Sequence, residues 1–311
     1  MEAEVKDFLM EARISKLEIR NNQEKENDQM TQPYAVWDLL LRALNLFRVS
    51  SFGFRILLLF VLVAAGCAAQ PSASDKASLA AASRSVETQQ YEQAIAQADT
   101  YLSRTPHGPG SAEALYLKGR GFEGRVAQNP GEAKKNLQAA RSAYVQALGM
   151  KPSQQTEAAI RTSLANVAYF QDDYNTASDQ WQAAYPKLTD ANVKGWVLYR
   201  IGICQQRLGQ FDRADQAFAQ AQREFPHSVP AQRSREHQGA RGFYVQLATF
   251  ASGASADKAA AALKTQGVTP VKTTDSKGNQ QLRVGPLSSY GQAMAMKSRF
   301  AGQYPDAMVV P

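Results

Sequence analysis

Apolar and polar residues along this chain follow two different periods, one in the middle and one near the end. From about residue 75 to residue 228, small and aromatic residues recur at the three- and four-residue spacing of helices. From Phe243 onward, short runs rich in β-branched and aromatic residues alternate with two Ala-bearing helical segments. The pattern therefore predicts an all-α region followed by a small α+β domain.

The helical region repeats with a period of about 34 residues, and its clearest unit is Gly195–Ser228. Gly202 falls in the first helix of this unit, Phe218 falls in the second helix, and Pro226 closes it. This order resembles the tetratricopeptide repeat (TPR), except at Gln205, where the family pattern has an aromatic residue. The resemblance implies a solenoid of helical hairpins that offers a concave groove to a protein partner.

Three further units precede the clearest one, and at least three must stack before such hairpins bury a core. Residues 158–190 and 112–153 repeat the spacing, the latter with an insertion at 127–136, and residues 75–106 match more weakly. We expect the large aromatic residues of these units to pack between helices rather than to contact a ligand. These residues are Tyr174, Trp181, Trp196 and Phe218.

The C-terminal segment has the order β-α-β-β-α-β, which predicts a four-stranded antiparallel sheet with two helices on one face. The basic segment that precedes it, residues 229–242, is expected to be a linker or a short capping helix. The predicted strands are 243–250, 268–274, 280–287 and 307–310, and the predicted helices are 254–266 and 290–303.

Two of the strand sequences, FYVQLATF (243–250) and LRVGPL (282–287), resemble those of the SPOR (sporulation-related repeat) domain family. The resemblance implies binding to peptidoglycan glycan strands that have lost their stem peptides, which are enriched at division septa. Gln281 stands where many members have Arg, and Ala248 replaces a frequent Gly. The family's ligand contacts map onto Gln246, Thr249, Gln281 and Arg283.

Strand alternation by itself, without the family resemblance, points to part of the same set of ligand-contact residues. It places Tyr244, Gln246, Gln281 and Arg283 on the sheet face that points away from the helices. An amide, a guanidinium and an aromatic ring on an open face suit a sugar, although an ordinary solvated face would also be polar. Strict alternation turns Thr249 toward the core unless the strand end twists, so we expect Thr249 to contribute less.

The longest apolar run, Ile56–Ala69, covers 14 positions, whereas a transmembrane helix needs about 20. Arginines precede the run, and small residues lead directly to Cys67, which is the order of a secretory signal with its cleavage site. The segment resembles a bacterial lipoprotein signal. The resemblance implies removal of residues 1–66 and lipid attachment at Cys67, and Ala68 favours the outer membrane, facing the periplasm.

Residues 1–29 are polar and mixed in charge, unlike the start of a signal, which suggests Met30 as the true start. The alternative is a cytoplasmic extension followed by an uncleaved apolar segment. Because one acyl chain binds membranes only marginally, stable anchoring at Cys67 would use several chains.

Composition narrows the chemistry further. The net charge of +7 suits nucleic acid, an anionic membrane or the acidic cell wall equally well; with the resemblances above, we expect the wall and the membrane, and no nucleic acid. Two cysteines exclude a disulfide framework, and Cys204 is expected to be a buried thiol. The three histidines are expected in loops or after helix ends, without metal-ligand spacing, so we predict no metal and no cofactor. They are His107, His227 and His237.

Together these observations predict a non-enzymatic cell-envelope lipoprotein with no catalytic residues, active in cell division or wall organisation. Two alternatives stay open: an outer-membrane protein-assembly lipoprotein with TPR repeats, and a peptidoglycan hydrolase, which would need paired carboxylates or an activated nucleophile. The expected divisions are the leader and signal 1–66, the tether 67–74, the solenoid 75–228, the linker or cap 229–242 and the glycan-binding domain 243–311.

Overall fold

The structure, a computed structural model, describes residues 72–311. The leader, the apolar run and the expected lipid attachment at Cys67 lie outside the described residues. Within residues 72–311, no helix is both long enough and apolar enough to cross a bilayer. The contacts divide the described residues into two compact units, 72–164 and 165–311, and each is described by itself.

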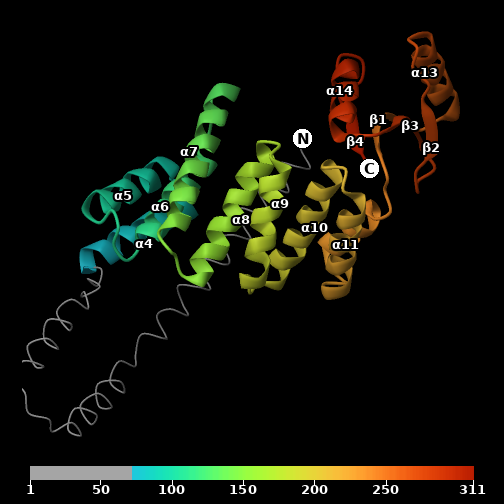
Figure 1. Cartoon of the computed structure of the whole chain (residues 1–311). Coiled ribbons are helices and arrows are strands. Elements are labelled where there is room, and N and C mark those ends of the chain that lie inside the picture. Colours follow the sequence, from blue (N-terminus) through green and yellow to red (C-terminus); the bar gives the residue numbers. More distant parts are fainter. Residues whose placement is uncertain (1–71) are drawn as a thin grey trace, which may run out of the picture. The chain divides into compact units, whose positions relative to one another are not determined.

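The described part of the first unit consists of helices that pair into hairpins (Figure 1). Ser72 caps the first helix through a reciprocal hydrogen-bonded box with Asp75, which satisfies donors that the helix end leaves free. The chain continues into the second unit through α8, Gln154–Phe170. The helices before it are α4 (Ala73–Glu87), α5 (Tyr91–Arg104), α6 (Ser111–Gly124) and α7 (Pro130–Gly149).

One expectation about this unit is wrong. Residues 127–136 were predicted to be an insertion between two helices, but Pro130–Asn136 form the first turns of α7. The Asn129 side chain accepts a hydrogen bond from the Glu132 backbone N–H, and Pro130 occupies the first turn. These are strong helix-start signals. The extra residues therefore lengthen the helix instead of the loop.

The second unit begins with helical hairpins and ends with the sheet. A short helix, α12, occupies the segment that was expected to be a linker or a cap, and Ser228 caps it. The helices that follow α8 are α9 (Tyr174–Ala184), the 3-10 turn η1 (Tyr185–Lys187), α10 (Ala191–Arg207), α11 (Phe211–Glu224) and α12 (Val229–His237).

Close approach of the two helices in a hairpin depends on glycine facing an aromatic ring. A Cβ atom added to Gly202 of α10 would lie 2.3 Å from the ring of Phe218, which is fully buried on α11. The same pairing recurs in the first unit, where a Cβ on Gly119 would lie 2.4 Å from the ring of Tyr144. The recurrence confirms the predicted repeat and explains its small residues.

The C-terminal part is the predicted four-stranded antiparallel sheet with two helices, so the fold class is confirmed. The strand order is β2-β3-β1-β4. The core contains Phe243, Val245, Leu247, Leu282 and Val284 from the strands, together with Leu263 and Phe300 from the helices. The elements are β1 (Phe243–Phe250), α13 (Gly253–Thr265), β2 (Val271–Thr274), β3 (Gln280–Leu287), α14 (Tyr290–Phe300) and β4 (Met308–Val310).

Aromatic and cationic side chains connect the last hairpin to this sheet within the second unit. The Arg207 guanidinium lies 4.6 Å from the centroid of the Tyr290 ring and donates a hydrogen bond to the Tyr174 hydroxyl. The rings of Phe211 and Phe243 lie 5.7 Å apart. These contacts bring the helix side of the sheet against α10 and α11. They are favourable when the groups are partly desolvated.

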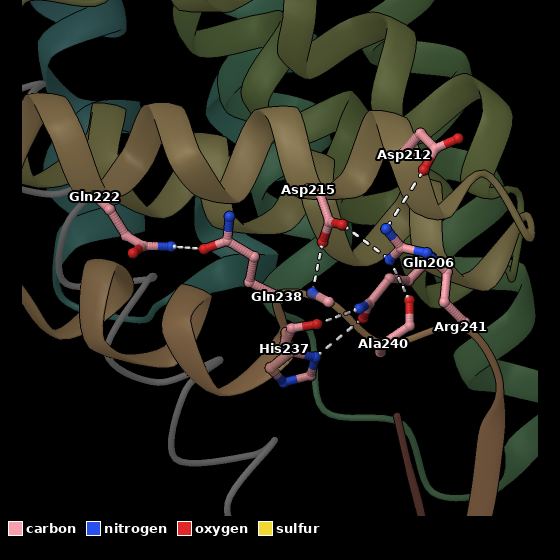
Figure 2. Close-up of polar contacts among 9 residues, drawn as sticks. Gln206, Asp212, Asp215, Gln222, His237, Gln238, Ala240 and Arg241 are labelled. Atoms are coloured by element: carbon pink, nitrogen blue, oxygen red, sulfur yellow. Dashed lines mark hydrogen bonds and ion pairs between the residues drawn. The ribbon is translucent and has the colours of Figure 1, made fainter.

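A polar network joins α12 and its following turn to α10 and α11 (Figure 2). The Gln206 side chain donates to the backbone oxygen of His237 at 2.8 Å, and its Oε1 lies 3.0 Å from His237 Nδ1. The Asp215 carboxylate accepts from the Gly239 backbone N–H and pairs with Arg241 at 2.8 Å. The network fixes α12 against the last hairpin.

His237 was expected in a loop or after a helix end, but it is the last residue of α12 and packs against Tyr199 and Phe218. The α12 helix brings the ring back onto α10 and α11, which the sequence pattern did not show. Burial, with smaller effects from Arg207 and Arg233, lowers the pKa of His237 to about 4. The ring is therefore neutral near pH 7. We assign Nδ1–H as the donor to Gln206, which leaves Nε2 to accept from the Tyr199 hydroxyl at 3.3 Å.

We predict that Gly202→Ala destabilises the protein. Overpacking against Phe218 costs about 1–3 kcal/mol, which outweighs the gain of about 1 kcal/mol in helix propensity. Denaturant unfolding measures the difference. Gly149→Ala in α7 is the control, because a Cβ there meets nothing within 4 Å. A Gly202→Ala protein as stable as the wild type would show that the glycine is not needed for the close approach.

We also predict that protonation of His237 destabilises the fold. Its pKa is lower in the folded state than the ordinary 6.5, so the unfolded chain binds the proton more readily, and the free energy of unfolding falls as pH falls from about 6.5 toward about 4. The loss over the whole window is at most about 3 kcal/mol. Urea unfolding between pH 5 and 6.5 should show this slope in the wild type and a smaller slope in His237→Gln; equal slopes would contradict the assignment.

Candidate functional site

The candidate site is the sheet face that the helices leave uncovered. Buried residues alternate along the central strands: Val245 and Leu247 of β1 and Leu282 and Val284 of β3 enter the core. The side chains between them occupy the opposite face. Because directly paired residues of antiparallel strands share a face, the strand register shows which side chains come together there.

The register brings the predicted residues onto this one face. Gln246 pairs with Arg283, and Thr249 pairs with Gln281. The Gln246 amide approaches the Thr249 hydroxyl at 3.4 Å, and Arg283 Nη2 donates to Gln281 Oε1 at 2.7 Å. Tyr244 pairs with Val310 of β4 and lies beside them. The structure therefore groups all five of the residues proposed to contact glycan.

Thr249 corrects one expectation. Alternation predicted that its side chain turns toward the core, but the register of β1 shifts between Gln246 and Ala248, so that both Leu247 and Ala248 stand against Leu282. Such a bulge inserts one extra residue and re-aims the side chains that follow. Thr249 is consequently exposed on the open face, whereas Phe250 packs against the core.

Arg283 is the strongest donor on this face. Its Nη2 is engaged by Gln281, but its Nε is buried and has no hydrogen-bond partner among residues 72–311. A guanidinium presents a fixed fork of N–H donors and cannot lose its charge. The side chain can therefore offer charge-assisted hydrogen bonds to an oxygen-rich or anionic ligand.

Gly285 determines where the Tyr244 ring lies. Its φ of +148° is a conformation that L side chains rarely adopt, and an added Cβ would lie 2.7 Å from Cδ1 of Tyr244 and 2.8 Å from the Phe243 backbone oxygen. Only glycine leaves room for the ring to lie directly against β3. The family-like sequence Val284-Gly285-Pro286 thus shapes the site as well as the strand.

Sequence reasoning missed three residues of this face. Val271 pairs with Arg283 and is 42% exposed, and Met308 pairs with Gln246 and is 50% exposed. Thr273 pairs with Gln281 and donates to its Oε1 at 3.3 Å. Polar groups thus occupy the centre of the face, with apolar side chains on both edge strands. The signal that could have found these residues is the cross-strand register, which no single strand contains.

Two carboxylates of this domain, Asp257 and Asp275, lie away from the open face. Asp257 of α13 forms an ion pair with Lys272, which pairs with Leu282 and therefore belongs to the helix side. Asp275 closes the turn between β2 and β3, where hydrogen bonds from Asn279 lower the pKa of its carboxyl group. Within the part of the chain that the structure describes, no group of His, Cys, Asp and Glu could hold a metal ion.

The other residues singled out in the sequence are mostly packed in the repeats. Trp181 and Phe218 are fully buried and Tyr174 is nearly so, as predicted, whereas Trp196 is half-buried under the guanidinium of Arg233. Cys204 is fully buried, and burial raises the pKa of its thiol to about 12. This confirms the predicted buried thiol, which packs as a small apolar residue.

Comparison with known proteins agrees with both parts of this architecture. Residues 239–311 match the SPOR domain, and residues 196–228 match the tetratricopeptide repeat. No curated protein matches the chain. The resemblances found in the sequence are therefore confirmed for the C-terminal domain and for the repeat built by α10 and α11.

Three solved structures are similar to about half of the chain. A thermophilic TPR protein of Thermus thermophilus is 16% identical, with a TM-score of 0.40, over 52% of this chain and 79% of that chain. The MamA protein is 16% identical (TM-score 0.41; 51% and 78%). YrrB, described as a TPR protein with an unusual peptide-binding site, is 19% identical (TM-score 0.39; 49% and 72%).

Proposed function

We propose that this chain is a non-enzymatic cell-envelope lipoprotein that binds peptidoglycan glycan with its SPOR domain and a protein partner with its TPR repeats. The observation that carries the glycan assignment is the grouping of Tyr244, Gln246, Thr249, Gln281 and Arg283 on one open sheet face. The site is formed by residues 239–311, which match the SPOR domain.

The chemistry of the face suits a glycan strand. The Gln246 amide can donate to a ring hydroxyl and accept from another, and the Tyr244 ring offers a surface for a pyranose. The exposed side chains of Val271 and Met308 can contact the methyl groups of N-acetyl substituents. A sugar polymer presents all three kinds of group, so one face can hold it through polar and apolar contacts together.

Arg283 supplies a physical reason for preferring strands without stem peptides. An amidase that removes the peptide converts the lactyl amide of the sugar into a free carboxylate. A guanidinium donates to a carboxylate through hydrogen bonds about twice as strong as those between neutral groups. We therefore propose that Arg283 faces this carboxylate, which would direct the domain to the stripped glycan of division septa.

The remaining parts of the proposal complete the architecture. Lipid attached at Cys67 would hold the protein at a membrane, which we propose to be the outer membrane facing the periplasm. Residues 67–74 would form the tether, residues 75–228 the repeats and residues 229–242 the cap that precedes the glycan-binding domain. The two matched modules are binding modules, which supports a function without catalysis.

We predict that Arg283→Ala and Gln246→Ala each weaken binding to amidase-treated sacculi by roughly tenfold or more. At Arg283 a lost hydrogen bond that involves a charged group costs about 1.5–3 kcal/mol, and Gln246 loses two neutral hydrogen bonds of about 0.5–1.5 kcal/mol each. About 1.4 kcal/mol is a factor of ten. Neither change touches the core residues, so melting temperatures should stay close to that of the wild type. Co-sedimentation with sacculi measures the binding.

Lys264→Ala is the matched control, since it removes a positive charge from the exposed helix side of the domain. It should bind like the wild type. If the wild type binds neither intact nor amidase-treated sacculi, the function is wrong. If both face variants bind as well as the wild type, a different surface holds the glycan.

We predict that the mature protein partitions into detergent and that Cys67→Ser abolishes this behaviour, because the change removes the sulfur that would carry the lipid. Detergent phase separation of whole-cell extracts, followed by mass spectrometry of the mature N-terminus, measures both the anchor and the cleavage site. Full retention of Cys67→Ser in the detergent phase would contradict lipid attachment at this residue.

A further inference from the structure

A groove of about 340 Å³ lies in the repeats, apart from the sheet face. It runs between α9 and α11, the second helices of two consecutive hairpins, and α10 lies beneath it. The buried side chains of Leu198 and Ile201 contribute an apolar floor. Glutamines surround this floor: Gln182 from α9, Gln205 from α10, and Gln216 and Gln220 from α11.

Gln205 is the residue that departs from the repeat pattern, which has an aromatic residue at this position. It is only 6% exposed, and its Nε2 donates to Ser178 Oγ at 2.7 Å. Its Oε1 is buried without a hydrogen-bond partner among the described residues. Ser178 also accepts from Gln182 at 3.0 Å. If the oxygen and nitrogen of the Gln205 amide were exchanged, the nitrogen would be the buried atom without a hydrogen-bond partner.

An unpaired buried amide atom destabilises a fold. An amide at this position, where the repeat has an aromatic residue, is therefore best explained by a bound group that forms the missing hydrogen bond. A peptide group offers an N–H donor and a C=O acceptor side by side, which matches either assignment of the Gln205 amide. On the walls, Gln182 and Gln220 already donate from Nε2 to Ser178 and Glu224. Their Oε1 atoms, together with Gln216, can pair with further peptide groups of an extended segment. The apolar floor can take one of its side chains.

A sugar fits the groove less well, because its lining contains a single aromatic residue, Tyr185, and a cation lies over that ring. Tyr185 at the rim is covered by the Lys194 ammonium group, 4.8 Å from the ring centroid. The Tyr185 hydroxyl is also engaged, since it donates to Glu224. Among the residues that line the groove, Arg213 alone carries a charge, and it is positive. The Glu224 carboxylate beside the rim is offset by the positive charges of Lys194 and Arg223. These features favour an acidic peptide over a glycan.

We propose that this groove binds an extended acidic segment of a protein partner through the Gln205 amide and Arg213. The inference rests on the proposed function, because it locates the partner site within the repeats. The site lies on the face of the second helices α9 and α11, and the SPOR sheet face takes no part in it.

The test uses the whole chain and a phage-displayed library of random 12-residue peptides. An enriched peptide is synthesised with a fluorescent label and titrated by anisotropy against variants. We expect the enriched peptides to be acidic. Gln205→Leu should weaken their binding about tenfold while keeping or raising the melting temperature, because it removes the unpaired amide atom. Arg213→Glu, a surface change on α11, should weaken binding at least as much and gives a second test if Gln205→Leu folds poorly.

Gln222→Ala is the matched control, since Gln222 lies on α11 outside the groove and pairs with Gln238. It should bind the peptide like the wild type. The inference is overturned if no acidic peptide is enriched, if enriched peptides bind Gln205→Leu and Arg213→Glu as tightly as the wild type, or if chitin oligosaccharides bind the groove in place of peptides.

Sacculus binding separates this inference from the proposed function. Gln205→Leu and Arg213→Glu should bind amidase-treated sacculi like the wild type, whereas Arg283→Ala should lose sacculus binding and keep peptide binding. If Gln205→Leu lost both sacculus binding and peptide binding at an unchanged melting temperature, the two sites could not be separate. If the peptides bind both groove variants as tightly as the wild type, the partner binds another face of the repeats and the glycan assignment is unaffected.

Discussion

The C-terminal domain depends on the antiparallel pairing of β1 with β3. This pairing places Val245 and Val284 in the core and Gln246 opposite Arg283 on the open face, so it creates the core and the candidate site together. A shift of one residue would exchange the two faces. The bulge at Leu247 makes such an exchange locally, and it brings Thr249 onto the polar face without moving the core residues before it.

The repeats show what sequence spacing can and cannot predict. The helix pairs followed from recurring small and aromatic residues, because Gly202 must face Phe218 for two helices to approach closely. Spacing within a repeat says nothing about contacts beyond it. It therefore did not show that Pro130–Asn136 extend a helix, or that α12 returns His237 to a half-buried position against Tyr199 and Phe218. Residue spacing contains neither cause: the Asn129 cap that starts α7, and the packing of α12 against α10 and α11.

The same distinction applies to the sheet face. Gln246 and Arg283 could be assigned from alternation and from family resemblance, because both signals lie within single strands. Val271 and Met308 could not, since their place beside those residues depends on which strands become neighbours and in what register. Thr249 was misjudged for a related reason: a bulge is a property of the strand pair, and alternation within one strand assumes that none is present.

The positions of the contacts argue that the proposed glycan and peptide sites can be occupied together. Tyr290 and Phe243 contact Arg207 and Phe211 from the helix side and the start of β1, which leaves the face of Gln246 and Arg283 uncovered by these contacts. The groove around Gln205 opens between α9 and α11. Arg207 contacts the SPOR domain and Gln205 lines the groove, and both lie near the end of α10. The same helix thus supports both sites, while the ligand-facing side chains of each belong to different elements.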